Sequence, residues 1–390
     1  MGMIHKTYLI SLVALIILFM TNTCGEMKIK WSELASLPPS VPGSIQPGVA
    51  GPFSGVTENI LLVAGGANFE NEMPWHGGKK SYHMEVYALD LSANDGLWFK
   101  NGPIDTLPVG VAYGASATVP DGVICMGGET ENGITDQVFI ISIQGDKVNL
   151  RQLPVLPLPL SNAASAAIGR VVYIAGGISP EGPSSALYCL DTQNTENGWM
   201  KLNDLPLPLI NSIMVASGGK NKFLWIFGGR TRGKEDDTSR IRCEIFKYSP
   251  DDNQWMQAGV LSSDGKDTLR LAAGTGAVVD DRHIAIFGGN DGLVFNKVEK
   301  LLSEMSREND SAVLERMRYE YIALQESHPG FVRDVLLFNT ENNDCLKVGE
   351  MPGPAQVTTV AIASVGGIII PSGEIRPGIR TSEIRFVRFK

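Results

Sequence analysis

The chain of 390 residues carries 33 Lys and Arg against 42 Asp and Glu, which gives a net charge of -9. An acidic chain of this kind lacks the electrostatic footprint of a nucleic-acid-binding protein, so we expect no nucleic-acid partner. With 43 Gly, 22 Pro and 19% charged residues, the composition favours β structure, and a chain of this size can bury a large core without disulfides.

The N-terminus predicts an export signal. Lys6 supplies a positive flank, and residues 9–20 form an apolar run. About a dozen apolar residues is the length of a signal-peptide core and too short to span a bilayer comfortably. We therefore assign residues 1–24 to a signal peptide. Cys24 follows the apolar run, so two alternatives stay open, namely simple cleavage or a lipoprotein signal that anchors the protein to the membrane through Cys24.

An apolar run that ends in a glycine pair recurs along the chain. The copies are ILLVAGG (60–66), GVICMGG (122–128), VVYIAGG (171–177), FLWIFGG (223–229), HIAIFGG (283–289) and GGIIIPSG (366–373), whose last pair is Ser-Gly. Each run is short, β-branched and bounded by Gly, which predicts a buried strand.

Three further strands accompany each apolar run. A small-residue strand precedes it, an alternating strand follows it, and a segment with Trp, Leu and often Pro comes last. Four antiparallel strands in a repeat of roughly 50 residues form a kelch blade. The sequence therefore predicts an all-β fold, a six-bladed kelch-type β-propeller that occupies residues 27–390 as one domain.

The sixth blade lacks its outer strand, because the chain stops just after residues 382–389. The segment IKWSELASLP (29–38) has the pattern of an outer strand and no repeat before it. We expect it to pair with residues 382–389, which closes the ring and protects both terminal edges.

Two repeats carry insertions. Blade one has a long loop after Gly66, and blade five has an insertion at about 291–331. Within the second insertion, residues 298–309 and 311–326 have apolar side chains at helical spacing, which predicts a helical pair. The pair is either a cap that packs on the propeller or a lid or wall over the central channel.

Cysteine usage argues against a metal site. Cys125, Cys189, Cys243 and Cys345 lie in or beside predicted strands at unrelated spacings, without a CxxC motif or a Cys/His pair. Zinc sites need such ligand groups. We therefore expect no metal and buried, unpaired thiols.

The residues after each glycine pair should ring one mouth of the channel, where loops concentrate binding residues. This ring contains Asn68, Glu129, Ile178, Arg230, Asn290 and Glu374. Charged loop residues such as Glu129 and Arg230 are usually just solvated. Glu374 and Arg380 differ, because they flank one short loop that Pro377 and Gly378 hold in a tight turn. A carboxylate beside a guanidinium offers a proton-transfer group and an anion clamp together.

The segment GEIRPGIRTSEI (373–384) resembles a Gly-Glu-x-x-Pro-Gly-x-Arg-Thr segment of the bacterial N-acetylneuraminate epimerase (sialic acid mutarotase) family. The members of that family are periplasmic six-bladed kelch propellers. Residues 62–150, with GGANF, GKKSYH and AYG, resemble the C-terminal part of those enzymes moved to the front. The resemblance therefore points to a cyclically permuted branch, and permutation of a closed ring is physically cheap.

This resemblance implies a periplasmic isomerase that interconverts the α and β anomers of N-acetylneuraminate by general acid/base catalysis, without a cofactor. Glu374 would be the acid/base, and Arg380 the partner of the sugar carboxylate. The substrate-binding candidates are Asn68, Lys80, Tyr113, Glu129, Arg230 and Asn290. A non-catalytic propeller that binds glycan or protein stays open as the alternative, because fold alone does not fix function. The oligomeric state is also open.

Overall fold

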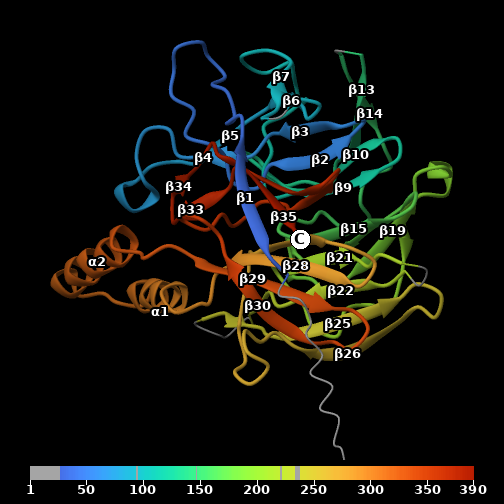
Figure 1. The fold of residues 1–390 in the computed structure, drawn as a ribbon. Helices are drawn as coiled ribbons and strands as arrows, with labels where there is room; N and C mark the ends of the chain where they lie inside the picture. The colour runs from blue at the N-terminus through green and yellow to red at the C-terminus, as the bar shows by residue number, and fades with distance from the viewer. Residues whose placement is uncertain (1–26, 94, 146, 220–221, 233–237) are drawn as a thin grey trace, which may run out of the picture.

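A computed structural model describes residues 27–93, 95–145, 147–219, 222–232 and 238–390. The expected signal peptide, with Cys24, lies outside the described residues. Six sheets of antiparallel strands are arranged around a central axis, as Figure 1 shows. This arrangement confirms the predicted six-bladed propeller. None of the helices in the described ranges is long and apolar enough to cross a membrane.

The strands of each blade follow one another outward from the axis. Blade one contains β2 (Phe53–Thr57), β3 (Ile60–Ala64), β6 (Glu85–Asp90), β7 (Leu97–Trp98) and β8 (Asp105–Thr106); blade two β9 (Ala115–Val119), β10 (Gly122–Met126), β13 (Val138–Gln144) and β14 (Lys147–Gln152); blade three β15 (Ala164–Ile168), β16 (Val171–Ala175), β19 (Leu187–Asp191) and β20 (Met200–Lys201).

The second half of the ring repeats this order. Blade four contains β21 (Ile213–Ala216), β22 (Leu224–Phe227), β25 (Glu244–Ser249) and β26 (Gln254–Val260); blade five β27 (Thr275–Val278), β28 (His283–Gly289), β29 (Val332–Asn339) and β30 (Cys345–Glu350); blade six β31 (Ile362–Ser364), β32 (Gly367–Pro371), β35 (Ile384–Phe389) and β1 (Ile29–Leu34).

The core lies between neighbouring blades. Both β3 and β10 are buried along their whole length, because each sheet packs a neighbour on both faces. Leu62 of β3 and Ile141 of β13 belong to one cluster of buried side chains, between blades one and two. Ile124 of β10 and Val172 of β16 belong to the next cluster, between blades two and three. This two-sided burial explains why the glycine-pair strands are continuously apolar.

Blade six is completed by the first described strand. The strand β1 pairs antiparallel with β35 from Ile29 opposite Phe389 to Leu34 opposite Ile384. Trp31 of β1 also donates its indole N–H to the carbonyl of Glu350 in blade five at 3.1 Å. The predicted closure of the ring is therefore confirmed, and β1 ties two blades together.

A closed circle of backbone hydrogen bonds surrounds the channel mouth. The residues that form it are Gly51, Tyr113, Asn162, Asn211, Ala273 and Thr358, one from each blade, and all have φ between +50° and +63°. Each N–H donates to the carbonyl of the member before it, and Gly51 donates to Thr358, at 2.7–3.0 Å. Left-handed backbone is easy for Gly and tolerated by Asn, but costs other residues roughly 1–2 kcal/mol. The circle therefore holds Tyr113, Ala273 and Thr358 in an unfavourable left-handed backbone conformation.

The insertion in blade five folds as predicted. It contains α1 (Phe295–Met305) and α2 (Ser311–Glu326), and Asp310 caps α2 by accepting from the backbone N–H groups of Ala312 and Val313. A residue with a side-chain oxygen is preferred at this position because it satisfies N–H groups that the helix leaves free.

The long loop of blade one reaches this helical pair. Its short 3-10 helix η1 (Pro74–His76) contacts α2, and His76 Nε2 lies 3.0 Å from Glu326 Oε1. Figure 1 shows α1 and α2 on the side of the ring where β33 and β34 emerge. The two insertions therefore meet over the same part of the propeller.

Candidate active site

Short two-stranded ribbons follow the glycine pairs of five blades. They are β4 (Ala67–Asn68) with β5 (Ser81–Tyr82), β11 (Glu129–Thr130) with β12 (Gly133–Ile134), β17 (Ile178–Ser179) with β18 (Gly182–Pro183), β23 (Arg230–Thr231) with β24 (Arg240–Ile241), and β33 (Glu374–Arg376) with β34 (Ile379–Arg380). In blade five the helical insertion takes this place.

Equivalent positions in the six blades are defined by backbone bridges next to the circle. The bridged residues are Ala67, Glu129, Ile178, Arg230, Asn290 and Glu374. Five of them are the residues that the glycine pairs predicted, but Ala67, not Asn68, holds the position in blade one. Because side chains alternate along a strand, the side chain of Asn68 lies on the opposite side. It is buried and donates to the carbonyl of Gly48 at 3.1 Å.

Glu374 and Arg380 lie directly opposite each other in the β33–β34 ribbon. Arg380 Nη1 donates to Glu374 Oε1 at 2.8 Å, and the backbone N–H of Gly378 donates to the same oxygen at 2.9 Å. Within the described part of the chain, Glu374 Oε2 accepts no hydrogen bond from another residue. One carboxylate oxygen therefore fixes the group, and the other is left for a ligand.

The guanidinium of Arg380 is enclosed by protein. Its side chain is only 3% exposed, and Nε donates to the carbonyl of Ala67 at 3.3 Å. Nη2 donates to the hydroxyl of Tyr113 at 3.4 Å, and the ring of Phe69 lies 5.2 Å from the guanidinium carbon. Arg380 thus holds Glu374 in place, and its expected contact with a sugar carboxylate stays a prediction.

A second polar cluster adjoins the first through Tyr113. Lys80 Nζ lies 3.1 Å from Glu129 Oε1 and 4.6 Å from the centre of the Tyr113 ring. The hydroxyl of Tyr82 also donates to Glu129. Burial raises the pKa of Tyr113 to about 12, and burial together with the bond to Glu129 raises the pKa of Tyr82. Both phenols are therefore protonated donors, and Lys80, Tyr113 and Glu129 gather as neighbours of Arg380.

A cavity of about 280 Å³ lies between blades four to six and the helical insertion. Glu374, Arg230 and Asn290 line it, so three of the predicted residues share one space. The apolar part of its wall includes Phe295 and Val298 of α1. The helical pair is therefore a wall of the cavity, and α1 also packs on the propeller through buried Val298 and Leu301.

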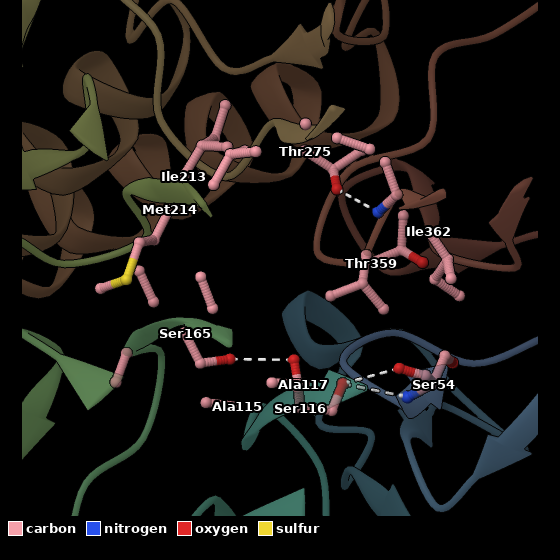
Figure 2. Close-up of a pocket in the computed structure, with 18 of the residues that line it drawn as sticks. Ser54, Ala115, Ser116, Ala117, Ser165, Ile213, Met214, Thr275, Thr359 and Ile362 are labelled. Atoms are coloured by element: carbon pink, nitrogen blue, oxygen red, sulfur yellow. Dashed lines mark hydrogen bonds between the residues drawn. The ribbon is translucent and has the colours of Figure 1, made fainter. Parts of the chain in front are cut away.

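The central channel is a second, adjoining cavity of about 360 Å³, shown in Figure 2. Its wall consists of the innermost strands with small side chains, and hydroxyls such as Ser165 and Ser116 bond to backbone carbonyls of neighbouring strands at 2.9–3.0 Å. Asn211 and Thr358 of the circle line both cavities. Among the described residues that form its wall there is no carboxylate or cation, unlike the cavity at Glu374.

Asn211 and His328 are among the polar residues of the Glu374 cavity that carried no signal in the sequence. Asn211 belongs to the backbone circle, and His328 follows the end of α2. Neither lies at a glycine pair or in the Glu374 loop, and the packing of blades four to six brings them to the cavity that Glu374 lines.

The four cysteines in the described part of the chain are free thiols. Cys125, Cys189 and Cys345 are buried as predicted, whereas Cys243 is partly exposed. Cys243 lies beside β25 (Glu244–Ser249), as expected, but its partial exposure corrects the expected burial of this thiol. Among the described residues, no group of three or more His, Cys, Asp or Glu side chains could hold a metal ion.

Comparison with known proteins gives partial matches to curated epimerases. The N-acetylneuraminate epimerase of Vibrio vulnificus is 36% identical over 140 residues, which are 33% of this chain and 34% of that protein. The enzyme so named from Vibrio cholerae is 35% identical over 130 residues, 31% of this chain and 32% of that protein. That of Yersinia enterocolitica is 37% identical over 133 residues, 32% of each. The chain thus spans about a third of the length of these relatives.

The solved structure of YjhT aligns with 92% of this chain and 100% of its own, with a TM-score of 0.61 and 14% identity, a likeness of fold alone. The family model of N-acetylneuraminate epimerase matches residues 19–150 and 153–390. That match includes nearly all of the propeller and every residue of the cavity around Glu374, and the chain therefore belongs to the N-acetylneuraminate epimerase family.

Proposed function

We propose that this protein accelerates the interconversion of the α and β anomers of N-acetylneuraminate. The observation that carries the proposal is the geometry of Glu374. Its Oε1 is fixed by Arg380 and Gly378, and the residue faces a mainly apolar cavity into which Arg230 and Asn290 bring polar groups. A volume of about 280 Å³ is close to the lower end of small-molecule pockets, which begins at roughly 300 Å³. The cavity therefore suits a monosaccharide.

The reaction needs one proton removed and one delivered at neighbouring atoms. A base takes the proton of the anomeric hydroxyl, the bond from the anomeric carbon to the ring oxygen breaks, and an acid protonates that oxygen. Rotation of the open-chain keto acid and the reverse steps then close the ring on the other face. Both oxygens are bonded to the anomeric carbon, so one carboxyl can serve in both steps. General acid/base catalysis of this kind is worth roughly 100- to 10,000-fold.

Glu374 is the acid/base in this proposal, acting through Oε2. Arg380 and the Gly378 N–H hold its other oxygen, so that the carboxyl keeps one orientation while a proton arrives and leaves. Preorganisation of this kind avoids reorganisation during the reaction. The neighbouring donors Lys80 and Tyr113, with Glu129, complete the polar surroundings of Arg380.

The names of the relatives support this proposal over a non-catalytic glycan- or protein-binding propeller. Curated proteins that resemble part of the chain are named N-acetylneuraminate epimerase, and the family model bears the same description. We further propose that the protein acts after export to the periplasm, either cleaved from its signal or lipid-anchored at Cys24, because of the signal-like residues 1–24. The cyclically permuted order of the segments stays a prediction.

Relaxation of the pure α anomer of N-acetylneuraminate, followed by NMR, tests the activity. The wild-type protein should shorten the relaxation time well below that in buffer, and Glu374→Gln should lose about 100-fold or more of the acceleration. Glu341→Gln is the matched control, since Glu341 is an exposed carboxylate in blade five away from the cavity. Equal rates with protein and with buffer, or full activity of Glu374→Gln, would overturn the proposal.

A further inference from the structure

Among the described residues, Arg230 is the cation that lines the cavity. It lies in the wall beside Glu374, its guanidinium carbon lies 5.4 Å from the centre of the Phe295 ring of α1, and Nη1 donates to the hydroxyl of Ser239 at 2.9 Å. Burial lowers the pKa of Arg230 below its usual value. A partly desolvated guanidinium that is pinned on one side binds an anion more strongly than a fully hydrated one.

His328 offers a neutral N–H donor in the same cavity. The residue is 7% exposed, packs beside Phe331, and accepts a hydrogen bond at Nδ1 from the backbone N–H of Gly330 at 3.0 Å. Because Nδ1 is the acceptor, the proton of the neutral ring is on Nε2. Burial also lowers the pKa of His328, which favours this neutral form.

The substrate of the proposed reaction carries its carboxylate on the anomeric carbon. A cation that binds this carboxylate must therefore lie within one monosaccharide of the acid/base. Both Arg230 and His328 share the cavity of about 280 Å³ with Glu374. The guanidinium of Arg380, in contrast, already donates hydrogen bonds to Glu374, Tyr113 and the backbone carbonyl of Ala67.

We propose that Arg230 and His328 form the subsite for the sugar carboxylate, with the guanidinium as the ionic partner and the His328 Nε2–H as a second donor. The inference rests on the proposed function. Arg380 is then a positioning residue for Glu374. The helical insertion supplies Phe295, which packs on Arg230, and His328 follows its second helix. In this proposal the insertion therefore gives the propeller its preference for an acidic sugar.

The test compares two substrates of similar shape that differ at the carboxylate. These are N-acetylneuraminate and its carboxamide analogue, in which an uncharged amide replaces the carboxylate. The rate of anomer exchange gives kcat/KM for each, and the wild-type protein should prefer the acid. Arg230→Gln should reduce this preference by about tenfold or more through KM, since a hydrogen bond to a charged group is worth about 1.5–3 kcal/mol.

Further variants separate the subsite from the fold. Arg230→Lys should retain part of the preference for the acid. If Arg230→Gln does not fold, Arg230→Met replaces it, because its apolar side chain can still pack on Phe295. His328→Gln retains an N–H donor, so its preference for the acid should be close to that of the wild type. His328→Phe lacks this donor and should prefer the acid less. Arg282→Gln is the control, because Arg282 is 62% exposed on the turn between β27 and β28, at the opposite end of the strand from the cavity.

The outcomes are distinct. An unchanged preference in Arg230→Gln together with a lost preference in Arg380→Lys would overturn the inference and return the carboxylate to Arg380. If the wild-type protein does not accelerate exchange, the proposed function fails, and calorimetry with the same two sugars decides the subsite. Tighter binding of the acid that Arg230→Gln abolishes then supports the subsite, and equal binding of the two sugars overturns it.

Discussion

Lys28 and Lys390 exchange two backbone hydrogen bonds of 2.9 Å each, one in either direction. They extend the six-residue register of β1 and β35 by one further pair. Blade six, which carries Glu374 and Arg380, therefore depends on a strand from the other end of the sequence.

Deletion of residues 28–36 should damage the site as well as the fold. Without β1, the strand β35 becomes an exposed edge, and the hydrogen bond from Trp31 to blade five is lost. We expect a lower unfolding temperature and loss of anomer exchange together, measured by calorimetry and NMR on one preparation.

A point substitution gives the milder version of the same experiment. Trp31→Ala removes an indole that lies edge-on to Phe287 at 5.9 Å, so about 1–3 kcal/mol of stability should be lost. Lys30→Ala, at the exposed neighbouring position, should stay within about 0.5 kcal/mol of wild type. A deletion variant that keeps its stability and activity would show that the closure does not support the site.

The backbone circle makes a prediction about one alanine. Ala273 has φ +58°, so Ala273→Gly relieves left-handed strain of roughly 1–2 kcal/mol and costs about 0.5–1 kcal/mol in chain entropy. Chemical denaturation should show unchanged or slightly higher stability. Ala277→Gly, four residues further on in the extended strand β27, removes a buried methyl without any relief and should cost about 1–2 kcal/mol. Equal losses in both variants would mean that the circle stores no strain.

The blades were predictable because their signals are local. The runs that end at Gly66, Gly128 and Gly289 are recognisable from a few residues each, and the alternating strands after them have the same property. The error at Asn68 also has a local cause, since a displacement by one residue along a strand exchanges its two sides.

The cavity could be predicted only in part. Arg230, Asn290 and Glu374 follow glycine pairs and share one wall, as the repeat implied. Asn211 and His328 reach the same wall from a backbone circle and from the end of an inserted helix. Their positions depend on how neighbouring blades pack against each other, which is a property of the tertiary structure. The enclosure of Arg380 has the same origin, because Ala67, Phe69 and Tyr113 come from other blades.

The turn at Gly378 should be essential for Glu374. Gly378 has φ +75°, and a Cβ there would lie 2.8 Å from Met73 Sδ and 3.2 Å from the ring of buried Trp75. Gly378→Ala therefore strains, through its positive φ and these contacts, the turn whose N–H holds Glu374 Oε1. We expect at least about a tenfold loss of kcat in the anomer-exchange assay, because small displacements of catalytic groups are costly.

A matched glycine separates this effect from ordinary turn strain. Gly182 in the β17–β18 ribbon also has positive φ, but a Cβ there would meet nothing within 4 Å. Gly182→Ala should lose some stability and keep its kcat. If both variants kept full kcat, Gly378 would not be needed to orient the carboxyl.

The neutral state of His328 predicts acid sensitivity. Burial lowers the pKa of His328, with the positive charge of Arg376 acting in the same direction and Asp291 opposing it. The unfolded chain therefore binds a proton at a higher pH than the folded chain does. As pH falls below the usual histidine value of about 6.5, the unfolded state is favoured and stability decreases. Above that value the contribution of His328 is constant.

His328→Gln should remove this part of the pH dependence. Urea unfolding at about pH 7.5 and about pH 5.5 brackets the window in which the proton is taken up. The wild-type protein should lose more stability between the two values than His328→Gln does, while His76→Gln, at the half-exposed contact with Glu326, controls for loss of a surface histidine. An equal loss of stability in wild type and His328→Gln would show that His328 takes up its proton as readily in the folded protein as in the unfolded chain, and burial would then not lower the pKa of His328.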